Sequence, residues 1–198
     1  MTVLNVSQYD ESYFEGDVGR GGYTSYSKWI KTLSKYAPYE SSKGDTWKNP
    51  AARLVKHYKI NGSLLELGCA YGHTLKQLQD ADIKDTHGID VSQFAIDNSV
   101  ASNTVVGDAI ESLKRYEDNK FDFIYSAEFL QCINEKDLPP LISEMNRVAK
   151  HRQFHIINIA VSPKYYNIKN MTEWINYQWM SNTILVPITN IQKEYIVN

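Results

Sequence analysis

The sequence predicts an α/β protein with a doubly wound, mostly parallel sheet of about six or seven strands, flanked by helices and closed by a short antiparallel C-terminal end. Short apolar runs alternate with segments of helical periodicity from residue 63 onward. Several of the runs end in glycine or in an acidic residue, where ligands bind in such sheets. The 198 residues suffice for one domain with a real core but leave no room for a second full one.

Each expected strand is a short apolar run. The first, SLLELG, ends in glycine, and the second, THGIDVS, ends in an acidic residue followed by a helix-capping serine. The five expected strands cover residues 63–68, 86–92, 104–109, 121–130 and 154–161. Near the C-terminus, TILVPI and KEYIVN are expected to be two further short strands.

The expected helices lie between these strands. Prolines stand in the first turns of PAARLVKHYK and LPPLISEMNRVAK, where a helix tolerates them. YGHTLKQLQD has helical periodicity, and Ser92 suits the N-cap of QFAIDNSVAS. The four helices cover residues 50–59, 71–80, 93–102 and 138–150, and TEWINYQWM is a fifth candidate near the C-terminus.

The N-terminal part of the chain has a different composition. Seven of the 14 tyrosines fall in the first 58 residues, and glycines interrupt the polar sequence there. We therefore expect a tyrosine-rich extension over residues 1–47, followed by the α/β domain over residues 48–198.

Composition limits the classes of function. A net charge of -2 offers no concentrated positive charge, so nucleic acid is not the expected partner. No apolar run reaches the length of a membrane span, and the first residues lack the pattern of a signal peptide. Cys69 and Cys132 are too few for a metal framework, so we expect two reduced thiols, no metal and a cytoplasmic location.

Acidic residues and glycines follow the first three expected strands. Gly68 and Gly72 allow a tight turn with close backbone approach to a ligand, and Glu66 just before them favours a cationic group. Asp90 follows the second strand and suits the hydroxyls of a ribose. Asp108 follows the third and suits the amino group of adenine. These groups fit a ligand with an amino-acid end, a ribose and an adenine, as in S-adenosylmethionine.

LLELGCAYG, HGIDVS, VVGDAIESL and FDFIYSAEFLQCI resemble, in this order, the successive motifs of class I, Rossmann-like S-adenosylmethionine-dependent methyltransferases. The resemblance covers about residues 48–162. It implies a Rossmann-like sheet, S-adenosylmethionine as cofactor, and in-line methyl transfer. The cofactor-binding residues that we expect are Glu66, Gly68, Cys69, Ala70, Tyr71, Gly72, Asp90, Val91, Asp108, Ala109 and Ser126, with Ile89 as a further wall of the adenine slot.

Three residues are candidates for the acceptor side of the reaction. Glu128 and Gln131 lie near the expected point of methyl transfer, and His73 stands just past the glycine turn. Many relatives that act on small molecules carry a histidine where Gln131 stands, and glutamine cannot be a general base. Each of the three has a plainer alternative as a structural or solvated residue. The same holds for Asp90 as a helix cap and Asp108 as a turn residue.

The sequence favours a methyltransferase that acts on a small-molecule or saccharide-like acceptor, at oxygen or nitrogen. Two alternatives remain: an enzyme that degrades S-adenosylmethionine or otherwise does not methylate, and a non-catalytic cofactor-binding partner subunit. The N-terminal extension resembles that of some glycan-pathway methyltransferases, and we expect it to form a lid in which Tyr13 and Tyr26 contact the cofactor. A homodimer is possible, although no residue specifies its interface.

Overall fold

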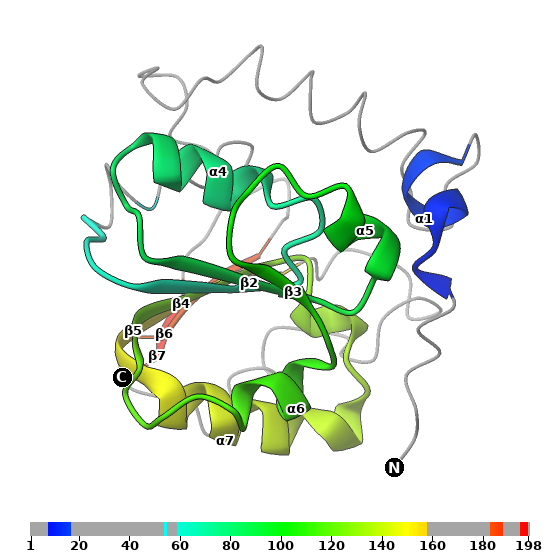
Figure 1. Cartoon of the computed structure of the whole chain (residues 1–198). Coiled ribbons are helices and arrows are strands. Elements are labelled where there is room, and N and C mark those ends of the chain that lie inside the picture. Colours follow the sequence, from blue (N-terminus) through cyan, green and yellow to red (C-terminus); the bar gives the residue numbers. More distant parts are fainter. Residues whose placement is uncertain (1–7, 17–53, 55–58, 158–182, 188–194, 198) are drawn as a thin grey trace. The chain divides into compact units, whose positions relative to one another are not determined.

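The computed structural model describes residues 8–16, 54, 59–157, 183–187 and 195–197 (Figure 1). These residues fall into two compact units. The first contains residues 8–16, 54, 59–61 and 69–107, and the second contains residues 62–68 together with the described residues from 108 onward. The expected helices over residues 50–59 and 172–180 lie outside the described residues, apart from isolated positions of the first.

The first unit contains two strands and three helices. Its elements are α1 (Glu11–Glu15), α4 (His73–Asp80), β2 (Thr86–Asp90), α5 (Gln93–Asp97) and β3 (Thr104–Val106). The two strands run parallel, with Gly88 opposite Thr104. α4 packs on β2 through its apolar stripe, in which Leu75 and Leu78 are fully buried, and α5 packs on both strands. α1 packs on α5.

α5 begins where the sequence predicts but ends earlier. The Ser92 hydroxyl accepts a hydrogen bond from the Ala95 N–H at 3.0 Å, which confirms Ser92 as the N-cap. The helix ends at Asp97 instead of residue 102. The reason is local: the Asn98 side chain donates to the Phe94 carbonyl, and the Ser99 hydroxyl donates to the Ala101 carbonyl. Side chains of these types compete with the helical backbone and favour turns.

The second unit contains most of the sheet. Its elements are β1 (Leu64–Leu67), α6 (Ala109–Leu113), β4 (Phe121–Ala127), the 3₁₀ turns η4 (Leu130–Cys132) and η5 (Glu135–Asp137), α7 (Leu138–Val148), β5 (Ala149–Ile157), β6 (Thr183–Pro187) and β7 (Tyr195–Val197). Within it the strand order is β1-β4-β5-β6-β7, where the first four are parallel and β7 is antiparallel to β6. Figure 1 shows β6 and β7 in red, as the expected C-terminal strands.

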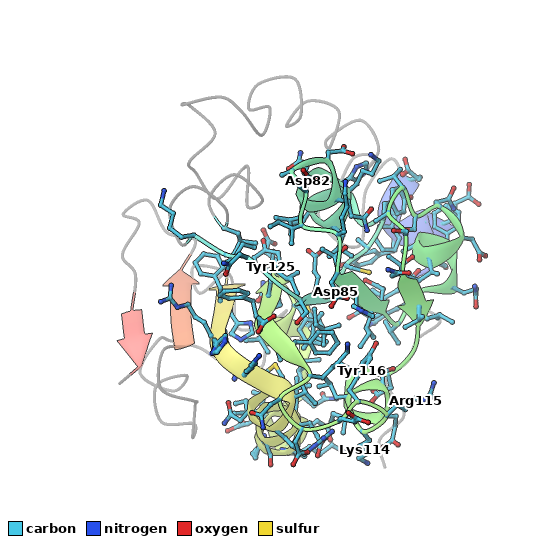
Figure 2. The ribbon with its side chains drawn as sticks, turned by 60° about the vertical axis from the view of Figure 1, so that its left-hand side comes forward. Asp82, Asp85, Lys114, Arg115, Tyr116 and Tyr125 are labelled. Atoms are coloured by element: carbon cyan, nitrogen blue, oxygen red, sulfur yellow. The ribbon has the colours of Figure 1, made fainter. Side chains whose placement is uncertain are left out.

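The core of the second unit lies between α7 and the sheet. All four residues of β1 are buried, and Tyr125 of β4, labelled in Figure 2, is fully buried and stacks on Phe154 with ring centroids 5.9 Å apart. The buried face of α7 consists of Leu138, Leu141, Ile142, Met145 and Val148. The mostly parallel sheet and its helices confirm the predicted α/β, Rossmann-like class.

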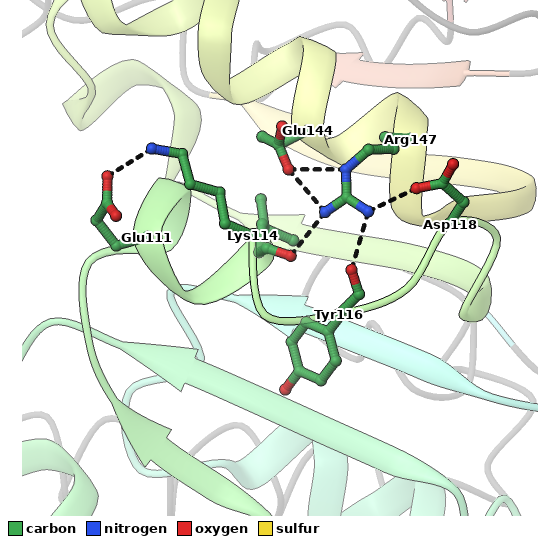
Figure 3. Close-up of polar contacts among 7 residues, drawn as sticks. Glu111, Lys114, Tyr116, Asp118, Glu144 and Arg147 are labelled. Carbon is green, nitrogen blue, oxygen red and sulfur yellow. Dashed lines mark hydrogen bonds and ion pairs between the residues drawn. The ribbon is translucent and has the colours of Figure 1, made fainter.

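Arg147, near the end of α7, joins α7 to the loop after α6 (Figure 3). Its guanidinium donates to Glu144 Oε2 from two nitrogens, at 2.9 and 2.8 Å. It also donates to the carbonyls of Leu113 and Tyr116 and to Asp118 Oδ1 at 2.7 Å. The planar, five-donor group thus closes the chain segment between α6 and β4 onto α7.

β5 begins five residues before the predicted strand, directly after α7. The sequence KHRQF is too polar to resemble a buried strand, yet Arg152 pairs with Phe123 of β4 and Gln153 with Ile124. Gln153 is fully buried there because its amide donates to Asn146 Oδ1 of α7 at 2.6 Å. Among the described residues, no helix is both long and apolar enough to cross a membrane.

Candidate functional site

The turn between β1 and α4 contains three residues in the left-handed region. Gly68, Ala70 and Gly72 have φ angles of 71°, 47° and 69°. A Cβ at Gly68 would lie 2.8 Å from the Phe129 ring, and one at Gly72 would lie 2.9 Å from Ala101 Cβ. Glycine is therefore required at both positions by space as well as by φ. At Ala70 the methyl group fits, and only the backbone conformation is strained.

Asp90 binds this turn to the end of β2 within the first unit. Its Oδ2 accepts from the Ala70 N–H at 2.8 Å, and its Oδ1 accepts from the Ser92 N–H at 2.9 Å. Burial nevertheless raises the pKa of Asp90 above its usual value, against the opposing effect of these N–H groups. The Val91 N–H also acts on this carboxylate, so of its about four acceptor positions at least one remains for a hydroxyl donor of a ligand. The helix cap is Ser92, so the alternative of Asp90 as the N-cap is wrong.

Residues 8–16 lie directly on this turn. Phe14, Tyr71 and Ala95 form a buried cluster, against which Tyr13 packs together with other partly buried aromatics. The Tyr71 hydroxyl donates to Glu15 Oε1 at 2.7 Å. The Ser92 hydroxyl donates to the Tyr9 carbonyl at 2.6 Å. Tyr13 therefore lies beside the predicted cofactor turn.

The remaining predicted residues of the first unit take ordinary positions. Cys69 is buried, and its Sγ lies 2.8 Å from where a Cβ on Gly88 would be, so it fills the space under the turn. Val91 is half-buried directly after β2. His73 begins α4, and burial lowers its pKa, which leaves the imidazole neutral at pH 7. Tyr26 lies outside the described residues.

In the second unit, the predicted cofactor residues lie at the ends of β1 and β4 and at the start of α6. Glu66 is buried in β1, and Leu67 pairs with Ser126 of β4. Asp108 caps α6 by accepting from the Glu111 N–H at 3.0 Å, and Ala109 is the first residue of that helix. Asp108 thus has a structural role whether or not it also contacts a ligand.

Glu128 and Gln131 follow β4 in unusual environments. Glu128 has a φ of 52°, a strained value for a residue with a side chain, and burial raises the pKa of its carboxyl group. Gln131 is 1% exposed, and within the described part of the chain neither its amide nitrogen nor its amide oxygen has a hydrogen-bond partner. An unpaired buried amide is costly, by about 1–3 kcal/mol, which points to a ligand as its partner.

A chain of buried side chains runs from the end of β4 to α7. Ser126 Oγ lies 2.8 Å from His155 Nδ1, and His155 Nε2 lies 3.2 Å from Gln153 Oε1. Gln153 in turn donates to Asn146, so His155 Nε2 carries the proton and the Ser126 hydroxyl donates to Nδ1. Desolvation lowers the pKa of His155 to about 3, so its ring is neutral.

The sequence reasoning missed Glu15 and His155. Glu15 bonds to a residue 56 positions away, and Ser126 to His155 across 29 positions. The only local signal was the polar alternation of Gln153 and His155 in a strand, where an apolar pair would be expected.

The arrangement fits the cofactor that the sequence predicts. The glycine turn leaves backbone room, and the Asp90 carboxylate retains acceptor positions beside it. In the second unit, the buried Gln131 amide is a separate polar group suited to a ligand. Among the described residues, no group of three or more His, Cys, Asp or Glu side chains could hold a metal ion.

Comparison with known proteins finds a family model that matches the central part of the chain. Residues 65–157 match the family model described as "Methyltransferase domain". No curated protein matches the sequence. Among solved structures, the chain is similar to an S-adenosylmethionine-dependent methyltransferase from Archaeoglobus fulgidus, with 23% identity, a TM-score of 0.47, and coverage of 63% of this chain and 55% of that one.

Two further solved structures are similar at the same level. The PH0226 protein from Pyrococcus horikoshii OT3 has 20% identity and a TM-score of 0.45, with 64% of this chain and 63% of that one covered. A possible histamine N-methyltransferase from Thermotoga maritima has 18% identity and a TM-score of 0.43, with 63% and 52% covered. The chain thus spans less than two thirds of the length of each. The family match confirms the predicted methyltransferase and its implied cofactor, S-adenosylmethionine, since residues 65–157 match a methyltransferase domain.

Proposed function

We propose that the protein transfers the methyl group of S-adenosylmethionine to an oxygen or nitrogen of a small-molecule or saccharide-like acceptor. The observation that carries this proposal is the cradle formed by Asp90 and the left-handed turn at Ala70 and Gly72. It offers a carboxylate with spare acceptor positions next to a backbone that a ligand can approach closely.

The first unit supplies residues for the ribose and the amino-acid end. The remaining acceptor capacity of Asp90 serves the ribose hydroxyls, and Val91 forms an apolar wall beside the adenine. At the turn, Tyr71 and Gly72 precede α4, whose first N–H groups favour the carboxylate of the amino-acid end.

The second unit supplies the remaining contacts. Glu66 attracts the cationic amino-acid end, while Asp108 and Ala109 contact the adenine. Ser126 lies beside the cofactor at the end of β4. The sequence motifs and the resemblance support these roles, which variants at each position can test.

The bound cofactor supplies an electrophilic methyl group on a sulfonium sulfur. The protein then has to align the acceptor and exclude water. The raised pKa of Glu128 makes its carboxylate a stronger base than an ordinary glutamate, suited to accept a proton from an acceptor hydroxyl or ammonium. The Gln131 amide can orient the same acceptor through one donor and one acceptor bond. Neutral His73 is a second candidate base.

We further propose that residues 1–47 act as a lid over the domain of residues 48–198. Contacts of α1 with the turn support this role, since Phe14 packs on Tyr71 and Tyr13 packs against the cluster that contains both. A protein that lacks residues 1–40 should lose affinity for S-adenosylmethionine; unchanged binding and turnover would contradict the lid.

Calorimetric titration with S-adenosylmethionine and S-adenosylhomocysteine, followed by mass analysis of products, tests the function. Methyl transfer to a sugar or other small acceptor supports the proposal. Cofactor breakdown without an acceptor supports the degrading alternative, and binding without transfer or breakdown supports the cofactor-binding partner subunit. Asp90→Asn should weaken binding by about tenfold to a hundredfold, whereas the exposed Asp97→Asn should not.

A further inference from the structure

Helix α1 and the residue before it are anchored by two separate hydrogen bonds. Glu15, its last residue, accepts from the Tyr71 hydroxyl at 2.7 Å. Tyr9, just before the helix, accepts from the Ser92 hydroxyl at 2.6 Å through its carbonyl oxygen. The first bond reaches the turn that follows β1, and the second reaches the segment that follows β2.

The Glu15–Tyr71 bond holds a residue that has little freedom of its own. Tyr71 is 5% exposed and lies between Ala70 and Gly72, both in the left-handed region. Its ring packs against Phe14, with centroids 5.3 Å apart. A phenol donating to a carboxylate is a charge-assisted bond, about twice as strong as a neutral one. Fixing the ring therefore fixes the backbone of the turn that carries it.

The two anchors differ in what they support. Tyr71 belongs to the turn that leads into α4, which the proposed function assigns to the amino-acid end of the cofactor. Ser92 instead donates its N–H to Asp90 Oδ1, which the proposed function assigns to the ribose. A change at Glu15 thus acts on the amino-acid end first.

We propose that Glu15 is a positioning residue that acts through Tyr71 on the amino-acid end of S-adenosylmethionine, so that α1 is part of the cofactor site. This inference rests on the proposed function, since it requires that the turn binds this cofactor. In this role Glu15 acts through its hydrogen bond with Tyr71.

Two ligands separate the amino-acid end from the rest. S-adenosylhomocysteine carries the amino-acid end, whereas 5′-methylthioadenosine lacks it and keeps the adenosine. Calorimetry on the full chain should show that Glu15→Ala and Tyr71→Phe each weaken the binding of S-adenosylhomocysteine by about tenfold. The affinity for 5′-methylthioadenosine should be unchanged. Glu15→Gln, whose amide oxygen still accepts the bond, should recover much of the affinity.

The control is Glu11→Gln, an exposed residue at the start of the same helix, which should leave both affinities unchanged. The double variant of Glu15 and Tyr71 should lose no more than either single one, because both remove the same bond. Circular dichroism confirms that each variant is folded.

Three outcomes would overturn the proposal. If both single variants fold and bind S-adenosylhomocysteine as tightly as the wild type, the bond does not position the cofactor. If the variants lose affinity for both ligands to the same extent, α1 has only a general structural effect. If the wild-type protein binds neither ligand, the proposed function fails, and the inference fails with it.

Discussion

Ala70 has a backbone conformation that favours glycine. Its φ of 47° costs an alanine about 1–2 kcal/mol, and its N–H is fixed by Asp90. Ala70→Gly should therefore raise the free energy of unfolding by up to about 1 kcal/mol, after the greater flexibility of glycine in the unfolded chain is counted. Denaturant unfolding measures this.

Ala95→Gly should instead lower the free energy of unfolding. Ala95 is fully buried within α5, where glycine lowers helix stability and leaves a small gap in the cluster with Phe14 and Tyr71. If Ala70→Gly destabilises the protein as Ala95→Gly does, the left-handed conformation at residue 70 is not strained.

Glu128 gives the proposed reaction a pH dependence. Burial raises the pKa of its carboxyl group, so the base becomes protonated, and the rate falls, at a higher pH than for an exposed glutamate. Glu128→Gln should remove this acid limb and lower kcat by roughly a hundredfold or more. The pH profile of methyl transfer to the acceptor identified by mass is the measurement.

Glu111→Gln serves as the control for Glu128, because the Glu111 side chain is exposed and its contact described above is an ion pair with Lys114. The pH profile of the Glu111→Gln variant should equal that of the wild type. An unchanged acid limb in Glu128→Gln would instead favour His73, which stays neutral and able to accept a proton over a wider range.

For single residues, the sequence predicts those roles that depend only on neighbours along the chain. Gly68 and Gly72 are needed for backbone reasons that the glycine spacing already signals, and Ser92 caps the helix that it precedes. Glu15 and His155 could not be found, because their partners Tyr71 and Ser126 come close only after folding.

Arg147 stabilises one element against the next. Three of its hydrogen bonds, to Leu113, Tyr116 and Asp118, hold the end of α6 and the following loop to α7, so Arg147→Ala should lower the free energy of unfolding by about 1–3 kcal/mol. The value is moderate because the side chain is partly exposed. Arg147→Lys keeps the positive charge but not the planar set of N–H donors, so it should recover little of the lost stability.

Lys114 is a matched control for the contacts of Arg147. It also pairs with a glutamate three residues before it, Glu111, at 2.7 Å, but it holds no second segment (Figure 3). Lys114→Ala should leave Tm unchanged in a thermal scan, where Arg147→Ala lowers it. Equal effects of the two substitutions would mean that the contacts to Leu113 and Tyr116 contribute nothing.

Elements with clear periodicity are the ones that sequence predicts well. α7 has an apolar stripe and prolines at its first turn, and it lies within two residues of its predicted end. β5 was missed by five residues at its start because Gln153 is buried through a bond to α7 that no local pattern shows. Helix α1 was not predicted, because its burial depends on residues far along the chain.

For the whole molecule, His155 predicts a loss of stability in acid. The unfolded chain binds a proton at His155 below about pH 6.5, while the folded protein resists it down to about pH 3. Stability should thus fall as the pH decreases through this window, by up to roughly 1.4 kcal/mol per pH unit from this residue. Unfolding by denaturant between pH 7 and pH 4 tests it.

His155→Gln removes the titrating group and keeps an amide able to bond Ser126 or Gln153. Its stability should depend less on pH than that of the wild type, even if it is lower at pH 7. A slope identical to that of the wild type would assign the acid sensitivity to other groups.

The contact between Tyr9 and Ser92 spans 83 residues and fixes an order of events during synthesis. The residues of α1 leave the ribosome before the surface that receives them, which is complete only when Ala95 has been made. The aromatic side chains of Tyr13 and Phe14 cannot be buried in this cluster until then. A nascent chain released before residue 95 would therefore leave α1 without its docking surface.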